Sequence, residues 1–171
     1  MLPLVSAQRH EQALRYKHTL GQYCCLKSWL MLQELSAISL QHSEFLYNEH
    51  GKPFIHHTPY TIHFSISHCK TGIAVAVDNK PIGIDIEAIR HADDELVART
   101  MNADERLAIR DDRDFIRFWT QKEAVVKMRG VGIQSFEQLQ GILSRSRDHE
   151  ITRPRIDTFE KANYIYSIAY E

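Results

Sequence analysis

Two acidic segments of the chain carry the side chains best suited to chemistry. One has the sequence Ile-Gly-Ile-Asp-Ile-Glu and contains Asp85 and Glu87; the other, Trp-Thr-Gln-Lys-Glu-Ala-Val-Val-Lys, contains Glu123 and Lys127. Magnesium is a hard cation that prefers carboxylate oxygens and keeps several waters for substrate phosphates. A lysine beside such carboxylates can neutralise phosphate oxygens. The two segments together therefore predict a site for magnesium and a pyrophosphate, which makes phosphate transfer the leading hypothesis.

The first acidic segment alternates as a β-strand does, with successive side chains on opposite faces. Its three isoleucines would be buried on one face, and Gly83, Asp85 and Glu87 would share the other. The two carboxylates would lie about 7 Å apart and repel each other, unless a divalent cation binds between them. Gly83 has no side chain, which would let a ligand approach the backbone. Taken alone, the segment is better explained by an ordinary half-exposed strand, although Asp and Glu are poor strand formers.

The second acidic segment lies in a predicted helix from Asp114 to Arg129, with Asp114 as its N-cap and Gly130 just past its end. Glu123 and Lys127 are four residues apart, so they lie on one helical face. A surface ion pair worth about 0.2–0.5 kcal/mol explains this pair on its own. The pair gains weight because the same small chain also holds the acidic strand.

A third segment, Phe-Ser-Ile-Ser-His, ends a predicted strand with the hydroxyl of Ser67 and the imidazole of His68. Both groups can hydrogen-bond to a phosphate. A structural role explains His68 equally well. The segment therefore supports a phosphate site only in combination with the two acidic segments.

The hydrophobic pattern places these segments in a mixed fold. A helical pattern with solvated basic residues runs from about Ala7 to Leu35, with Ser6 as its N-cap, and Gly21 makes it either two helices or one with a weak point. Further helices are predicted at 93–101 and 104–110, and strands at 45–47, 62–67, 72–77, 82–87, 142–143 and 164–170. The strands between 62 and 87 are predicted to form a three-stranded antiparallel meander. This order of elements predicts an α+β protein of two similar lobes.

Composition and charge exclude several classes of protein. The chain has 171 residues, 43% of them hydrophobic, which fits one domain of ordinary size or two small lobes with a shared core. Its formal net charge of −1 argues against bulk nucleic-acid binding, which usually needs a basic excess. Three cysteines, two of them adjacent, favour a reducing, cytoplasmic compartment. No apolar run is long enough to cross a bilayer, and residues 1–8 lack the pattern of a secretory signal.

Four motifs together resemble those of one family, the 4′-phosphopantetheinyl transferases, in the surfactin-synthetase-activating type rather than the short trimeric type. In order they are Gly51-Lys52-Pro53, Phe64 to His68, Ile82 to Glu87 and Trp119 to Lys127. Each motif alone is weak, but the combination in this order is highly specific. Ser65 stands where the family usually has asparagine, and Cys69 stands where serine is common. Neither departure removes a proposed ligand.

The resemblance implies a fold and a reaction. The fold would be a single α+β domain, 1–171, of two pseudo-symmetric lobes at approximately 1–80 and 81–171. Each lobe would be an antiparallel sheet packed with helices, with coenzyme A in the cleft between them. The reaction would move the phosphopantetheine arm of coenzyme A to a serine of an apo acyl or peptidyl carrier protein and release adenosine 3′,5′-bisphosphate. The protein would be a monomer, because the second lobe supplies what a neighbouring subunit supplies in the short type.

The resemblance also implies roles for individual residues. Magnesium would be held by Asp85, Glu87 and Glu123. Glu123 would also take the proton of the carrier serine, and Lys127 would contact the pyrophosphate. Contacts with the adenosine 3′-phosphate or neighbouring parts of coenzyme A would come from Lys52, Ser67 and His68, with further basic and hydroxyl contacts from Lys27 and Ser28. Lys122 is left to packing or to the support of residues that touch the ligand.

Other classes of protein share part of this pattern. A magnesium-dependent nuclease or phosphodiesterase also uses clustered carboxylates and a lysine, but Ala88 and Ile89 follow Glu87 where its D…[DE]-x-K pattern needs the lysine. A degenerate coenzyme A-binding or scaffold protein would be expected to lose ligands, whereas all three carboxylates and Lys127 are present. A phosphopantetheinyl transferase therefore explains the sequence best.

Overall fold

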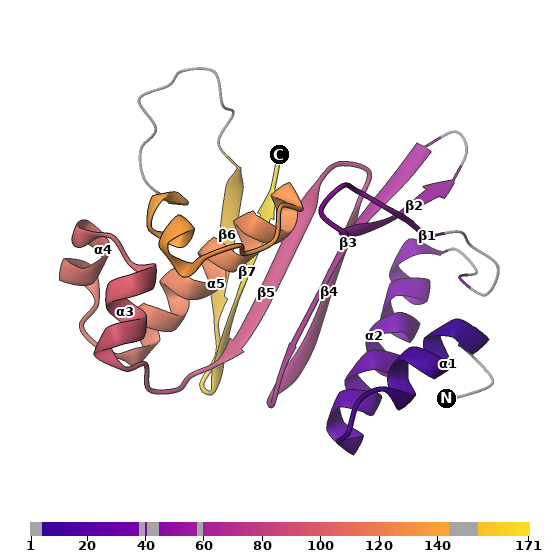
Figure 1. Ribbon diagram of the computed structural model, residues 1–171, viewed down its shortest axis with the longest axis horizontal. Helices are drawn as coiled ribbons and strands as arrows, with labels where there is room; N and C mark the ends of the chain where they lie inside the picture. The colour runs from indigo at the N-terminus through magenta and orange to yellow at the C-terminus, as the bar shows by residue number, and fades with distance from the viewer. Residues whose placement is uncertain (1–4, 38–39, 41–44, 58–59, 144–153) are drawn as a thin grey trace.

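The computed structural model describes residues 5–37, 40, 45–57, 60–143 and 154–171. Within this part of the chain, two antiparallel sheets lie between two groups of helices, which confirms the predicted α+β fold with helix-packed antiparallel sheets. In Figure 1 the layers run from α1 and α2 on the right, through the two sheets, to α3, α4 and α5 on the left. None of the described helices is long and apolar enough to cross a membrane.

The N-terminal part of the chain forms a helical pair on a four-stranded sheet. The elements are α1 (Ala7–Leu14), α2 (Thr19–Ser36), β1 (Phe45–Tyr47), β2 (Pro53–His57), β3 (Tyr60–Cys69) and β4 (Gly72–Asp78), with the strands paired in that order. Ser6 caps α1 as predicted, because its hydroxyl accepts the Arg9 N–H. The helical pattern is two helices, and the break falls before Gly21, at residues 15–18. Trp29 of α2 and Phe64 of β3 belong to the core that joins helices and sheet.

The C-terminal part forms a three-stranded sheet crossed by one long helix. The elements are β5 (Ile82–Ala88), α3 (Asp94–Thr100), α4 (Ala103–Ala108), α5 (Asp112–Arg129), the 3-10 helix η2 (Phe136–Gly141), β6 (Arg155–Glu160) and β7 (Tyr164–Tyr170), with the sheet order β5-β7-β6. The prediction that Asp114 caps α5 was wrong, because the Asp111 side chain is the cap and accepts the Asp114 N–H. Gly130 ends the helix as predicted, in the left-handed conformation that glycine tolerates. The strand predicted at 142–143 was also wrong, since those residues form a turn after η2, and β6 was not predicted.

The predicted meander over residues 62–87 is wrong in its third strand. β5 pairs with β7 in the second sheet rather than with β4. The N–H groups of Ile84 and Ile86 donate instead to the hydroxyls of Ser65 and Ser67 on β3, at 3.0 and 3.3 Å. Both bonds join residues 19 apart, so β5 runs alongside β3 in the same direction. Buried N–H groups need partners, and here side-chain hydroxyls take the place of a backbone ladder.

Both faces of β5 are buried, which excludes an ordinary half-exposed strand. Its isoleucines pack with Ala74 and Ala76 of β4 in a core between the two sheets. Its other face lies under α5, where a Cβ built on Gly83 would be 2.0 Å from the Ala124 carbonyl oxygen and 2.4 Å from the Met128 nitrogen. The missing side chain at Gly83 therefore admits the helix, and not a ligand as predicted.

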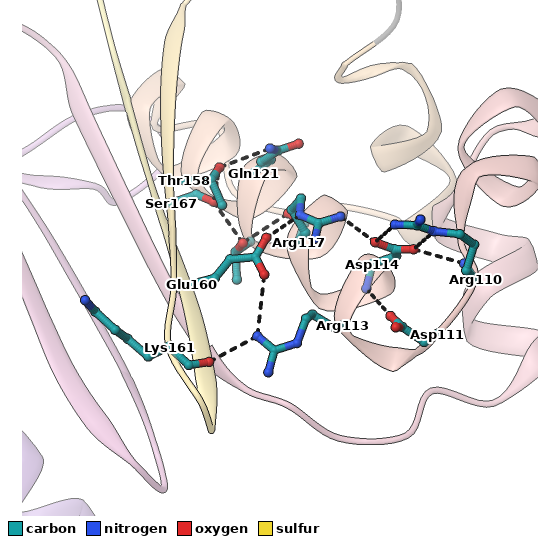
Figure 2. A network of polar contacts seen from close by, with 11 residues as sticks. Arg110, Asp111, Arg113, Asp114, Arg117, Gln121, Thr158, Glu160, Lys161 and Ser167 are labelled. Atoms are coloured by element: carbon teal, nitrogen blue, oxygen red, sulfur yellow. Dashed lines mark hydrogen bonds and ion pairs between the residues drawn. The ribbon is translucent and has the colours of Figure 1, made fainter.

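A polar network ties the first half of α5 to β6 and β7 (Figure 2). Arg117 donates to the Glu160 carboxylate at 2.6 Å and also to Asp114. The buried hydroxyls of Thr120 and Ser167 share a hydrogen bond of 2.9 Å. Because these contacts join the helix to the sheet at several points, they fix its rotation and its height above the sheet. The later residues of α5 are thereby carried to a defined place beside β5.

Candidate active site

Asp85 is the centre of the candidate site. It lies on β5 beneath α5 and is only 3% exposed. Its Oδ1 accepts hydrogen bonds from the Ser67 hydroxyl on β3 (2.8 Å) and from the Lys127 ammonium on α5 (2.6 Å). Its Oδ2 is buried and has no hydrogen-bond partner among the described residues. A buried carboxylate oxygen without a partner is unfavourable, so Asp85 offers a ligand to a cation or to a donor on a substrate.

Lys127 closes this cluster from the helix side. Its Nζ lies 3.0 Å from the Ser67 hydroxyl oxygen as well as 2.6 Å from Asp85. The Lys127 side chain keeps 30% of its surface exposed, so it is open to a ligand. The three side chains come from β3, β5 and α5 and so unite both sheets with the helix. Lys127 is the positive charge that balances Asp85 in this arrangement.

Glu123 lies one helical turn before Lys127 and has the properties of a general base. Burial raises the pKa of Glu123 to about 7, helped by the negative charges of Asp85 and Glu87 and opposed by Lys127. A carboxylate with a pKa close to the ambient pH can both take and release a proton readily. The position therefore suits the removal of a proton from an attacking hydroxyl.

Glu87 extends the group of carboxylates along β5. Burial raises its pKa and the charge of Asp85 raises it further, whereas Arg90, Lys127 and a hydrogen bond with the Trp119 side chain lower it. Glu87 and Glu123 thus both sit where negative charge is crowded and positive charge is short. A bound cation would relieve this crowding.

The chemistry of these carboxyl groups fits magnesium, although their positions do not form a finished metal site. The donors are all carboxylate oxygens, as a hard cation requires, and Asp85 Oδ2 is free of hydrogen bonds within the described part of the chain. Among the described residues, no group of three or more His, Cys, Asp or Glu side chains is placed so that it could hold a metal ion. The Lys127 ammonium on Asp85 Oδ1 supplies positive charge at this point instead.

A cavity of about 580 Å³ opens beside the cluster. Its wall is built by the start of α1, the turn before β2, the middle of β3, and the end of α5 with the loop that follows. Glu123 and Lys127 reach it from α5, Ser65 from β3 and Lys52 from the turn. This volume lies in the range of about 300–1,000 Å³ that is typical of small-molecule sites. Cavity and cluster together form a ligand site with a charged, reactive wall.

Not every predicted ligand contact reaches this cavity. Lys52 lines it, but its ammonium donates to the carbonyl oxygens of Ile82 (2.9 Å) and Met128 (3.1 Å). Burial lowers the pKa of Lys52 to about 8. His68 is exposed and lies outside the lining of the cavity. Asp85, Ser67, Glu123 and Lys127 are therefore brought together, and His68 is not.

Lys27 and Ser28 of α2 also lie outside the cavity lining. The Ser28 hydroxyl is buried, donates to the Cys25 carbonyl oxygen (3.1 Å) and accepts from Arg9 (3.1 Å). Arg9, which the sequence pattern assigned to a solvated face, is the basic residue of this region that lines the cavity. Its guanidinium lies 5.0 Å from the centre of the Trp29 ring. Its position three residues after the predicted N-cap Ser6 is the sequence signal that could have distinguished it from the other basic residues.

Lys122 has a structural role. It is fully buried, and its ammonium donates to the Glu105 carboxylate (2.6 Å) and to the carbonyl oxygens of Thr100 and Leu139 (2.8 Å each). Burial lowers the pKa of Lys122, and Glu105 opposes that shift. Lys122 thus joins α5 to the shorter helices, which corresponds to the packing alternative.

Comparison with known families identifies the class of protein that this fold and site define. Residues 81–169, just over half of the chain, match the family model of the 4′-phosphopantetheinyl transferase superfamily. The chain therefore belongs to this superfamily. The matched part contains β5 and α5, and with them Asp85, Glu87, Glu123 and Lys127.

Individual relatives match a longer part of the chain. It is 30% identical over 141 residues to 4′-phosphopantetheinyl transferase psf-1 of Bacillus pumilus, a match that covers 77% of this chain and 60% of that protein. It is 28% identical over 139 residues to 4′-phosphopantetheinyl transferase gsp of Aneurinibacillus migulanus, covering 75% and 57%. It is 36% identical over 114 residues to 4′-phosphopantetheinyl transferase AcpT of Salmonella typhi, covering 60% and 58%. The chain thus spans about three fifths of the length of these relatives.

Proposed function

We propose that this chain transfers the 4′-phosphopantetheine arm of coenzyme A to a serine of an apo acyl or peptidyl carrier protein and releases adenosine 3′,5′-bisphosphate. The observation that carries the proposal is the cluster of Asp85, Ser67 and Lys127, with Glu123 beside it at the wall of the cavity. Membership in the superfamily and the names of the relatives support the same activity.

The proposed reaction is a phosphoryl transfer, in which the protein mainly supplies positioning and charge. The serine oxygen of the carrier forms a bond to the phosphorus that bears the pantetheine, and the bond from this phosphorus to the bridging oxygen breaks. The electron pair of the broken bond leaves with adenosine 3′,5′-bisphosphate. The serine proton passes to the Glu123 carboxylate, directly or through water, which a pKa of about 7 favours at neutral pH. Lys127 neutralises phosphate oxygens as charge builds up on the leaving group.

We propose magnesium as the metal of this site, with Asp85, Glu87 and Glu123 as the residues that hold it. When bound, the ion would neutralise charge on the pyrophosphate and stabilise the leaving oxygen. The unpartnered Oδ2 of Asp85 and the raised pKa of Glu87 and Glu123 support the assignment, because each reports a shortage of positive charge.

We place the nucleotide part of coenzyme A in the cavity. The residues proposed to contact coenzyme A are Lys52 and Lys127, which line the cavity, and, outside its lining, Lys27, Ser28, Ser67 and His68. Arg9 adds a guanidinium to the wall and is a further candidate for a phosphate contact. Contacts from outside the lining would require the ligand to extend beyond the cavity.

The remaining proposals concern the state of the protein. We propose a single domain with lobes at approximately 1–80 and 81–171, since the first sheet ends at residue 78 and the second begins at residue 82. We propose a monomer, because both lobes of the site belong to one chain. Three free cysteines support a cytoplasmic location, where thiols stay reduced.

Intact-mass spectrometry of an apo carrier protein, incubated with this chain, coenzyme A and magnesium, tests the proposed activity. We expect a mass gain of one phosphopantetheine arm. Neither the wild-type chain with a chelator nor the Asp85→Asn variant should produce this gain. Glu95→Gln is the matched control, because the Glu95 side chain is 84% exposed and pairs only loosely with Arg99. No gain with several acyl and peptidyl carriers, from a folded chain that binds coenzyme A, would contradict the transfer and indicate a binding protein.

A further inference from the structure

The turn between β1 and β2 reaches across the cleft and holds the end of α5. Asn48 Nδ2 donates to the Gly130 carbonyl oxygen at 2.9 Å, and Lys52 Nζ donates to the Met128 carbonyl oxygen at 3.1 Å. Met128 lies in the last turn of α5, and Gly130 is its C-cap. Two side chains from the first lobe therefore bind carbonyl groups at the C-terminus of a helix in the second lobe.

The C-terminus of a helix needs such partners. Its last four carbonyl groups have no N–H partner within the helix and carry partial negative charge. The Gly130 N–H donates to the Val126 carbonyl oxygen at 2.9 Å, and the Lys52 ammonium donates to the Met128 carbonyl oxygen. The positive charge of Lys52 thus lies at the helix end where the helix dipole favours a cation. Lys52 Nζ also donates to the Ile82 carbonyl oxygen at the start of β5, at 2.9 Å. One ammonium thus joins the turn, α5 and β5.

The turn that carries these donors is itself held together by hydrogen bonds. Asn48 Oδ1 accepts the N–H groups of His50 (3.0 Å) and Lys52 (2.7 Å), and the Asn48 and Lys52 main chains are joined at 3.0 Å. Gly51 takes the left-handed conformation within the turn (φ 82°). Asn48 therefore uses its amide oxygen to hold the turn and its amide nitrogen to hold the helix.

Gly130 allows this close approach. A Cβ at this position would lie 2.7 Å from Asn48 Nδ2 and 2.9 Å from Lys52 Cδ. Gly130 and Lys52 also line the cavity. The glycine that ends α5 is thus also the point at which the first lobe touches it, beside the ligand site.

We propose that Asn48 and Lys52 form an inter-lobe clamp that positions α5 and thereby sets where Glu123 and Lys127 stand. Lys127 lies three residues and Glu123 seven residues before Gly130, on the same helix. A shift of the clamped end therefore moves both. For the Lys52 ammonium, this positioning role is an alternative to the contact with the adenosine 3′-phosphate proposed above. The clamp rests on geometry alone, and only its effect on transfer rests on the proposed function.

Hydrogen exchange of the ligand-free chain, followed by mass spectrometry, tests the clamp itself. Lys52→Met removes the ammonium, and Asn48→Asp removes the donor to Gly130 while keeping the oxygen that holds the turn. We expect faster exchange in peptides that cover 126–130 for both variants. The control is Glu49→Gln, because Glu49 lies on the same turn and its side chain is 84% exposed. The amides of 126–130 in this variant should exchange at the wild-type rate. Unchanged exchange at 126–130 in Lys52→Met and Asn48→Asp would overturn the clamp.

Kinetics with coenzyme A and with 3′-dephospho-coenzyme A separate the two roles of Lys52. A clamp predicts a kcat lower by about 10- to 100-fold with little change in KM, because a small displacement of the reacting groups is enough. It also predicts that the preference for coenzyme A over the dephospho form stays at the wild-type ratio. The double variant should be no slower than the slower single variant, because the two residues act as a unit.

The opposite pattern would overturn the positioning role. A phosphate ligand predicts a raised KM for coenzyme A, an unchanged kcat and a loss of preference over the dephospho form in Lys52→Met. If the wild-type chain modifies no carrier, the proposed function fails. The exchange measurement still decides the clamp in that case.

Discussion

The two halves of α5 differ in whether their acidic side chains have positively charged partners. In the first half, Asp114 accepts hydrogen bonds from Arg110 and Arg117, and these hold its pKa well below the usual range (Figure 2). In the second half, Glu123 faces Asp85 and its pKa is raised to about 7. One helix of 18 residues therefore carries a charge-compensated cluster and a cluster that is short of positive charge. In the first cluster opposite charges pair within the fold, whereas in the second a bound proton or cation would relieve the excess of negative charge.

Two lysines of this helix show the same contrast. Lys122 is fully buried and donates to a carboxylate and two carbonyl oxygens. Lys127 is 30% exposed, faces the cavity and shares one carboxylate oxygen with Ser67. An ammonium whose three donors are all used inside the fold is a structural residue. An ammonium that is partly exposed beside a cavity, as in Lys127, can bind a phosphate.

Among these changes, Glu123→Gln should have the largest effect on activity. It tests the second half of α5, where positive charge is short. The amide cannot take the serine proton, so we expect a kcat lower by about 100- to 10,000-fold with the fold retained. Steady-state transfer to an apo carrier measures this. Glu34→Gln, an exposed position on α2, is the control. Wild-type kcat in the Glu123→Gln variant would rule out Glu123 as the base.

Lys122→Met should show that the buried Lys122, although it lies in the second half of α5 beside Glu123, belongs to a charge-compensated pair with Glu105. The change leaves Glu105 buried without its partner, and we expect the free energy of unfolding to fall by about 3–5 kcal/mol. Urea denaturation measures this loss. Adding Glu105→Gln should restore part of it, because the unpaired charge is then removed. A loss below about 1 kcal/mol would contradict the structural role.

Asp114→Asn should destabilise the protein in a pH-dependent way. The pKa of Asp114 is lowered in the folded state, so its contribution to stability is present above the ordinary aspartate pKa of 3.8 and is lost as the pH falls below that value. We expect a loss of about 2–3 kcal/mol at pH 7 that shrinks in acid, measured by urea denaturation. Asp112→Asn, at a side chain 44% exposed, is the control. An equal loss at pH 7 and in acid would contradict the ion-pair explanation.

Glu123→Gln should also change how the free energy of unfolding depends on pH. Compared with Asp114→Asn, this change should have the opposite sign and be smaller. The folded-state pKa of about 7 lies above the ordinary glutamate pKa of 4.5, so the favourable protonated form is lost as the pH rises through 7. Relative to the wild type, the glutamine variant should gain about 1–2 kcal/mol between pH 5 and pH 8 in the presence of a chelator. The same difference in stability at both pH values would show that Glu123 is not held protonated by its surroundings.

Much of the candidate site could be predicted from the sequence, because short-range periodicity decides which side chains share a face. The strand period placed Asp85 and Glu87 together, and the helix period placed Glu123 and Lys127 together. The hydrogen-bond partners of the Lys52 ammonium could not be predicted in the same way. Its partner Met128 is 76 residues away along the chain, and the partner of Asn48 is 82 residues away. Only the packing of the β1–β2 turn against the end of α5 brings these groups within hydrogen-bond distance.

The sequence by itself determined the local features of this protein: the cap at Ser6, the end of α5 at Gly130, and the order of elements that makes an α+β fold. Each depends on neighbours within a few residues. The tertiary structure alone decided that β5 joins β7, that Gly83 admits α5, and that Lys122 is structural while Lys127 faces the cavity. Burial and the distance between charges set these outcomes, and both depend on residues that lie far apart in the sequence.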